Sequence, residues 1–132
     1  MTGDMRPRVL LVDDNDAILD RAAAILEPRC EIVGIATDGS SALKAVKSLH
    51  PDILVLDISL PGMSGFELAT RLQRDNSPPR IVFLTVHDDD EFVTAAQAAG
   101  GLGYVVKPRL ASDLLPAVME AREGRRFVSR TK

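Results

Sequence analysis

The stretch Val9–Asp14, VLLVDD, joins four apolar residues directly to two acidic ones. Three later apolar runs also end at a polar residue: Ile53–Leu56 at Asp57, Ile81–Leu84 at Thr85, and Tyr104–Val106 at Lys107. Short apolar runs are typical of strands that are buried on both faces of a parallel sheet. Because parallel strands present their carboxyl ends at one edge, we expect the acids, the hydroxyl and the ammonium group to converge there.

Helical patterns separate these predicted strands. Apolar residues at helical spacing predict a helix over Asp16–Glu27, which Pro28 ends, and another strand is expected at Glu31–Ala36. Four more helices are predicted from their caps and breakers: one between Asp38 and Pro51, one from Ser64, one through Ala99, and one from about Ser112. The last helix is placed there because Pro116 is tolerated only near a first turn.

The alternation of strand and helix predicts an α/β fold, namely a flavodoxin-like (βα)5 doubly wound parallel sheet. Right-handed crossovers limit the topology, and the strand order 2-1-3-4-5 suits a chain of this size. In that order the first and third strands are neighbours. We therefore expect Asp13, Asp14 and Asp57 to lie side by side.

Composition narrows the class of protein. The 132 residues suffice for one domain, with 45% hydrophobic and 27% charged residues. The net charge of −3 argues against direct nucleic-acid binding by this segment. The single cysteine, Cys30, excludes an internal disulfide and fits a reducing, cytoplasmic location. No signal peptide is visible, and no apolar stretch approaches the roughly 20 residues of a membrane helix, so we expect no membrane association.

Clustered carboxylates, a hydroxyl and a lysine indicate phosphoryl chemistry. Three carboxylates repel one another and favour a divalent cation, and Mg²⁺ prefers such oxygen ligands. A carboxylate can also attack phosphorus to give an aspartyl phosphate. Lys107 and Thr85 could then bind oxygens of the phosphoryl group.

Taken together, the motifs resemble the receiver domain of bacterial two-component response regulators over almost the whole chain. The matching pieces are Val12–Asp14, Leu56–Gly65, Leu84–Thr85 and Gly103–Pro108. The stretches Leu114–Val118 and Gly124–Ser129 are similar to the receivers of NarL/LuxR-type transcriptional regulators, which precede a helix-turn-helix domain.

The resemblance implies a phosphoacceptor and a Mg²⁺ site. Asp57 would take a phosphoryl group from a sensor histidine kinase or a histidine phosphotransfer protein. Asp14 would ligate Mg²⁺ directly, with Asp13 close by and often acting through water. Asp57 itself and the backbone carbonyl of Ser59 would complete the protein ligands.

The resemblance also implies a switch. Lys107 would bind the phosphoryl group, Thr85 would be the switch hydroxyl, and Tyr104 would be the coupled aromatic that turns inward on activation. A half-buried strand residue with a solvated hydroxyl is the alternative role for Tyr104. In similar domains the Lys107–Pro108 peptide bond is cis. Residues at the positions of Ser59 and His87 influence how long the phosphoryl group survives.

Residues 1–124 would form the receiver domain, and residues 125–132 a C-terminal tail or truncated linker. The segment would be either a single-domain regulator or the receiver part of a helix-turn-helix transcription regulator. Its output face would be built by the fourth helix, fifth strand and fifth helix, and phosphorylation could produce a homodimer there. Such a protein is a switch and not an enzyme, apart from self-phosphotransfer and autodephosphorylation.

Two other classes share some of these features. In a haloacid-dehalogenase-like phosphatase, Asp14 would be the nucleophile of the D-x-D motif Asp14–Asp16, although the domain is short for that class. In a flavodoxin-like binding module, the loop after the first strand would have to cradle a phosphate. Four acidic or amide side chains in that loop, Asp13–Asp16, would repel a phosphate in the absence of metal.

Overall fold

Six parallel strands form one sheet in the order β2-β1-β3-β4-β5-β6, in a computed structural model that describes residues 6–130. The strands are β1 (Arg8–Val12), β2 (Glu31–Ala36), β3 (Ile53–Asp57), β4 (Arg80–Thr85), β5 (Gly101–Val106) and β6 (Phe127–Val128). The helices are α1 (Asp16–Leu26), α2 (Gly39–Leu49), α3 (Gly65–Leu72), α4 (Asp90–Ala98) and α5 (Leu110–Arg122), with a short 3₁₀ turn, η1 (Lys107–Arg109), before α5. The predicted fold class and the order of the first five strands are confirmed.

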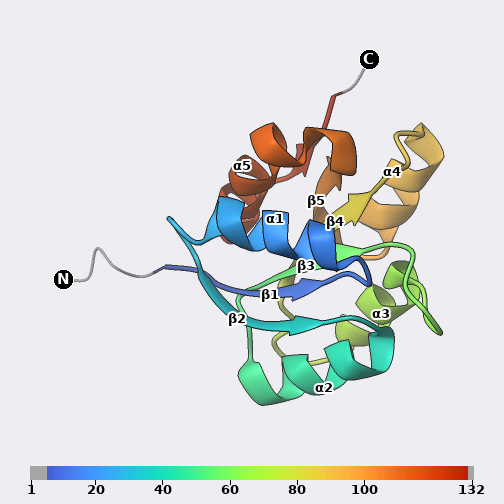
Figure 1. Ribbon diagram of the computed structural model, residues 1–132. Coiled ribbons are helices and arrows are strands. Elements are labelled where there is room, and N and C mark those ends of the chain that lie inside the picture. The colour runs from blue at the N-terminus through green and yellow to red at the C-terminus, as the bar shows by residue number, and fades with distance from the viewer. Residues whose placement is uncertain (1–5, 131–132) are drawn as a thin grey trace.

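The sheet separates two apolar cores. Helices α1 and α5 cover one face, and α2, α3 and α4 cover the other (Figure 1). Side chains of β1 point alternately into the two cores. Leu10 and Val12 pack toward α2 and α3, while Val9 and Leu11 pack toward α1 and α5. Burial on both faces explains why the central strands are continuously apolar.

The C-terminal tail adds a strand that was not predicted. Phe127 and Val128 pair in parallel with Gly103 and Tyr104 of β5, so residues 125–130 include the sixth strand. Phe127 packs against one core and Val128 against the other. The tail therefore extends the packing on both faces of the sheet beyond α5.

The predicted start of the last helix was wrong. Helix α5 begins at Leu110, and Pro116 lies inside it. An internal proline removes one backbone hydrogen bond and costs about 3 kcal/mol. The helix tolerates this cost because one of its faces is completely buried: Leu110, Leu114, Ala117, Val118 and Ala121 are all inaccessible to solvent.

The predicted cis bond between Lys107 and Pro108 was also wrong, since residues 6–130 contain no cis peptide bond. Strand β5 runs directly into η1, where Pro108 occupies the second position of the turn. The fixed φ of a trans proline suits the first residues of a helical turn, and its missing N–H is not needed there.

Helices able to cross a membrane are absent from the described part of the chain. The longest helix, α5, has 13 residues.

Candidate functional site

The polar residues predicted to converge lie at the carboxyl edge of the sheet. Asp13 follows β1, where its N–H donates to Ala36 O at 3.1 Å, and Asp57 and Thr85 are the last residues of β3 and β4. Asp13, Asp57 and Thr85 are buried, with 1%, 3% and 2% of their surface exposed. Lys107 follows β5 directly. The strand order therefore brings together residues that are nearly a hundred positions apart.

Three carboxylates form the centre of this site. One oxygen from each of Asp13, Asp14 and Asp57 lies within 4.8 Å of the others. Asp13 Oδ1 accepts a hydrogen bond from Asn15 N at 2.9 Å, and Asp57 Oδ1 accepts one from Ser59 N at 3.1 Å. These backbone donors fix the orientation of both carboxylates.

Lys107 lies between two of the acids. Its Nζ is 3.0 Å from Asp13 Oδ2 and 3.5 Å from Asp57 Oδ2, and its side chain is mostly buried. The buried Asp13 Oδ2 nevertheless lacks a well-aligned hydrogen bond, so its contact with the ammonium group is an ion pair only. One ammonium facing three carboxylates leaves two formal negative charges uncompensated.

This excess of negative charge acts on Asp57. The pKa of its carboxyl is raised to about 6, chiefly by burial and next by the neighbouring charge of Asp13. The Ser59 N–H and the Lys107 ammonium oppose that rise. At neutral pH the Asp57 carboxylate still predominates, so it can act as a nucleophile.

The same geometry fits a hard divalent cation. The three acids offer oxygen ligands close together, and the buried Asp13 Oδ2 has no hydrogen-bond donor. Mg²⁺ is usually held by one or two carboxylates and retains several waters, which suits a site with one exposed acid, Asp14. A metal role for the carbonyl of Ser59 remains a prediction.

The raised pKa of Asp57 predicts a specific pH dependence of stability in metal-free protein. Because the folded state binds the Asp57 proton more tightly than the unfolded chain, this group's contribution to stability falls as pH rises from about 4 to about 6. Asp57→Asn removes the cost of ionising this buried carboxyl. The variant should be more stable than the wild type by about 2 to 3 kcal/mol at about pH 8, and by almost nothing below about pH 4.

Urea unfolding of both proteins in excess chelator, at a series of pH values, measures this difference. Other carboxyl groups titrate in both proteins and cancel from the comparison. A stability difference that does not change with pH would contradict the proposed electrostatic origin.

A glycine behind Asp57 is required by close packing. A Cβ at Gly65 would lie 2.4 Å from the Asp57 carbonyl oxygen and 2.9 Å from Ile58 Cα. Gly65 N also donates to Ile58 O at 2.7 Å, so the backbone cannot easily move away. Ser64 caps α3 here as predicted, with Glu67 N donating to its Oγ at 3.1 Å.

Gly65→Ala should therefore destabilise the protein by about 3 kcal/mol, as typical for a side chain forced into a packed site. It should also displace Asp57. Gly62 in the same loop is the control, because a Cβ there meets nothing within 4 Å and only its φ of +78° opposes substitution. We expect Gly62→Ala to cost about 1 kcal/mol. Equal losses of stability for the two variants, measured by urea unfolding, would show that the contact with Asp57 does not matter.

The loop after β4 connects Thr85 with Tyr104. Thr85 Oγ1 accepts a hydrogen bond from His87 N at 3.1 Å, and Tyr104 donates its hydroxyl to His87 O at 2.7 Å. The His87 ring stacks on Phe92 of α4, with ring centroids 4.1 Å apart. Tyr104 is 2% exposed and its hydroxyl is bonded to protein, so the alternative of a half-buried side chain with a solvated hydroxyl is wrong. Burial raises the pKa of Tyr104 to about 12, with smaller contributions from two acids of this loop, Asp89 and Asp88.

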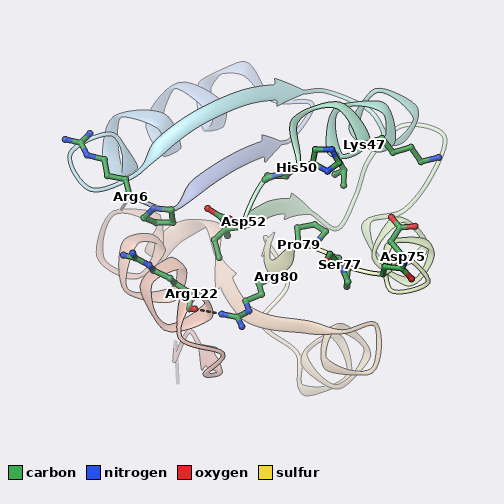
Figure 2. Close-up of a pocket in the computed structure, with 15 residues that line it drawn as sticks. Arg6, Lys47, His50, Asp52, Asp75, Ser77, Pro79, Arg80 and Arg122 are labelled. Atoms are coloured by element: carbon green, nitrogen blue, oxygen red, sulfur yellow. Dashed lines mark hydrogen bonds between the residues drawn. The ribbon is translucent and has the colours of Figure 1, made fainter. Parts of the chain in front are cut away.

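A pocket of about 830 Å³ lies at the opposite edge of the sheet (Figure 2). Its lining includes Asp52, Asp75 and Arg80, and none of the clustered acids. The Arg80 guanidinium donates there to the carbonyl oxygen of Arg122 at the end of α5. Arg80 thus provides a hydrogen-bond donor for a backbone carbonyl at the end of α5. The pocket is separate from the acidic site.

Sequence reasoning missed one buried acid, Asp113 of α5, which is 6% exposed. The only local signal was its spacing of four residues from Arg109, which predicts a pair on one helix face. Its neighbour Ser112 also bonds to it, while its remaining partner, Ser129, comes from the tail and could not be predicted without the sixth strand.

Comparison with known proteins identifies the family. The response regulator receiver domain model matches residues 9–119. LiaR, a transcriptional regulatory protein of Bacillus subtilis (strain 168), is 36% identical over 119 residues, which cover 89% of this chain and 56% of LiaR. The nitrate/nitrite response regulator protein NarL of Escherichia coli (strain K12) is 32% identical over 123 residues, which cover 92% of this chain and 57% of NarL. The chain thus spans little more than half the length of these relatives.

A solved structure agrees with this assignment. A two-component response regulator of the LuxR family from Aurantimonas sp. SI85-9A1 is 31% identical and superimposes with a TM-score of 0.87, over 92% of this chain and 89% of that one. The haloacid-dehalogenase-like alternative is not supported by these matches. The chain belongs to the response regulator receiver domains of two-component systems, and its relatives are regulators of the NarL/LuxR type.

Proposed function

We propose that Asp57 accepts a phosphoryl group from a histidine kinase or histidine phosphotransfer protein, in a Mg²⁺-dependent reaction. The observation that carries this proposal is the arrangement around Asp57. Its buried carboxylate lies 3.5 Å from the Lys107 ammonium and within 4.8 Å of oxygens from Asp13 and Asp14. No other acid in residues 6–130 belongs to such a cluster.

In the proposed reaction an Asp57 carboxylate oxygen attacks the phosphorus of the donor. A phosphorus–oxygen bond forms as the bond from phosphorus to the donor's leaving atom breaks. The Ser59 N–H holds the carboxylate in one orientation, and Lys107 binds an oxygen of the incoming phosphoryl group. Mg²⁺, held by Asp13, Asp14 and Asp57, would neutralise the charge that develops on the transferring oxygens.

The switch would act through the loop between β4 and α4. A phosphoryl group carries about −1.5 to −2 charge and attracts hydrogen-bond donors. Thr85 could turn its hydroxyl toward that group, releasing the bond from His87 N. Because Tyr104 is bonded to the carbonyl of the same residue, His87, such a movement would reach β5 and the α4–β5–α5 face.

The finer assignments follow from the same proposal. The protein acts in the cytoplasm as a switch without turnover of its own beyond self-phosphotransfer and autodephosphorylation. The α4–β5–α5 face forms a homodimer on phosphorylation. Residues 1–124 form the receiver unit, to which the tail adds strand β6, and in a longer protein this unit would control a helix-turn-helix domain.

Mass spectrometry of the intact protein tests the metal requirement. With Mg²⁺ and acetyl phosphate as donor, we expect the gain of one phosphoryl group, and with excess chelator we expect none. Mg²⁺ should also bind without any donor, as measured by a rise in resistance to urea unfolding. Phosphorylation that continues in excess chelator would contradict the proposed role of the acidic cluster.

A further inference from the structure

The buried acid Asp113 ties the C-terminal tail to α5. Ser129 donates its hydroxyl to Asp113 Oδ2 at 2.7 Å, and Arg109 donates to the same oxygen at 2.9 Å. Ser112 donates to the other oxygen, Oδ1, at 2.9 Å. Burial raises the pKa of the Asp113 carboxyl, but these hydrogen bonds outweigh burial and leave its pKa lowered, so the group is ionised at neutral pH.

Ser129 also bonds to two residues near the end of β5. Its N–H donates to Tyr104 O at 2.8 Å, which continues the pairing of β6 with β5. Its Oγ accepts a hydrogen bond from Val106 N at 3.2 Å. One residue of the tail therefore bonds to Tyr104 and to Val106, and the latter immediately precedes Lys107.

The turn that carries Lys107 is held at both ends by this network. Val106, before Lys107, donates to Ser129, and Arg109, at the end of η1, pairs with Asp113. Ser129 and Asp113, which hold the two ends of the turn, are themselves joined by the 2.7 Å hydrogen bond. Between them the Lys107 side chain extends to Asp13 and Asp57.

We propose that Ser129 and Asp113 are positioning residues for Lys107, so that docking of the tail and occupancy of the phosphoryl site are coupled. This inference rests on the proposed function of Asp57 and Lys107. Coupling of two binding events is reciprocal: a docked tail favours the phosphoryl group, and the phosphoryl group favours a docked tail.

Titration with beryllofluoride, a phosphoryl mimic, in saturating Mg²⁺ tests whether a docked tail favours binding at the phosphoryl site. Tyr104 fluorescence reports binding, because the chain has one tyrosine and no tryptophan. Ser129→Ala removes the hydroxyl that bonds to both Asp113 and Val106. We expect this variant to bind beryllofluoride about fivefold more weakly, a loss equal to the net contribution of one ordinary hydrogen bond, because the backbone pairing of the tail remains. Ser129→Thr keeps the hydroxyl and should restore the wild-type affinity.

Ser112→Ala is the matched control. It also removes a hydroxyl bonded to Asp113, but it leaves the bonds among Asp113, Ser129 and Val106 intact. We expect its affinity for beryllofluoride to match that of the wild type. Equal losses in Ser112→Ala and Ser129→Ala, or no loss in Ser129→Ala, would overturn the inference.

Hydrogen exchange of the wild type tests the reverse direction and needs no substitution. The amides of Val106 and Ser129 should exchange several-fold more slowly when Mg²⁺ and beryllofluoride are bound. Unchanged exchange at both amides, with beryllofluoride bound, would overturn the coupling and leave the proposed function standing. Failure of the wild type to bind beryllofluoride at all would overturn both.

Discussion

Asp57→Asn protein should gain no phosphoryl group from Mg²⁺ and acetyl phosphate. An amide oxygen is a far weaker nucleophile than a carboxylate, and it cannot form an acyl phosphate. The variant should remain folded, because Asp57 contributes no net stabilisation that the amide would lose: its pKa is raised to about 6 by burial and by the charge of Asp13. Intact mass spectrometry of wild type and variant measures the loss.

Asp75→Asn is the matched control for this prediction. Asp75 is exposed and lines the pocket at the opposite edge of the sheet, so its amide variant should be phosphorylated like the wild type. Full labelling of Asp57→Asn would show that another residue accepts the phosphoryl group. Equal partial phosphorylation of both variants would point to non-specific phosphorylation by the donor.

Lys107→Met should slow phosphorylation by on the order of 10²-fold. A buried charged donor aimed at a developing negative charge typically contributes a factor of that size. Methionine keeps the length and the apolar stem of lysine but removes the ammonium that lies 3.0 Å from Asp13 and 3.5 Å from Asp57. The initial rate of mass gain, at fixed Mg²⁺ and acetyl phosphate, measures the effect.

Lys47→Met, on the exposed end of α2, controls for a general change in charge and should leave the rate unaltered. The variant Lys107→Met should also bind beryllofluoride weakly. An unchanged phosphorylation rate in that variant would mean that the ion pairs of Lys107 stabilise the unphosphorylated structure and do not assist phosphoryl transfer.

The sequence alone was sufficient to predict most of the fold, for a physical reason. The central strands are buried on both faces and are therefore continuously apolar, so runs such as Ile53–Leu56 are easily recognised. Each run ends at a polar residue at the carboxyl edge of the sheet. Once the strand order was inferred, the clustering of Asp13, Asp14 and Asp57 followed from it.

What could not be predicted depends on contacts between distant segments. Strand β6 has only two residues, too few to show a periodic pattern, and it exists because β5 offers a free edge. The early start of α5 reflects burial that outweighs the cost of Pro116. The partners of Asp113 include Ser129, 16 residues away, and their meeting requires the sixth strand to be in place.

Locating the phosphoryl group within the chain is the most direct test of the account. Wild-type protein phosphorylated with Mg²⁺ and acetyl phosphate is reduced with borohydride, which converts an aspartyl phosphate to homoserine, and is then digested and sequenced by mass spectrometry. We predict homoserine at position 57 and at no other aspartate. Homoserine at Asp14 or Asp13, with Asp57 unmodified, would contradict the assignment of Asp57 as the phosphoacceptor.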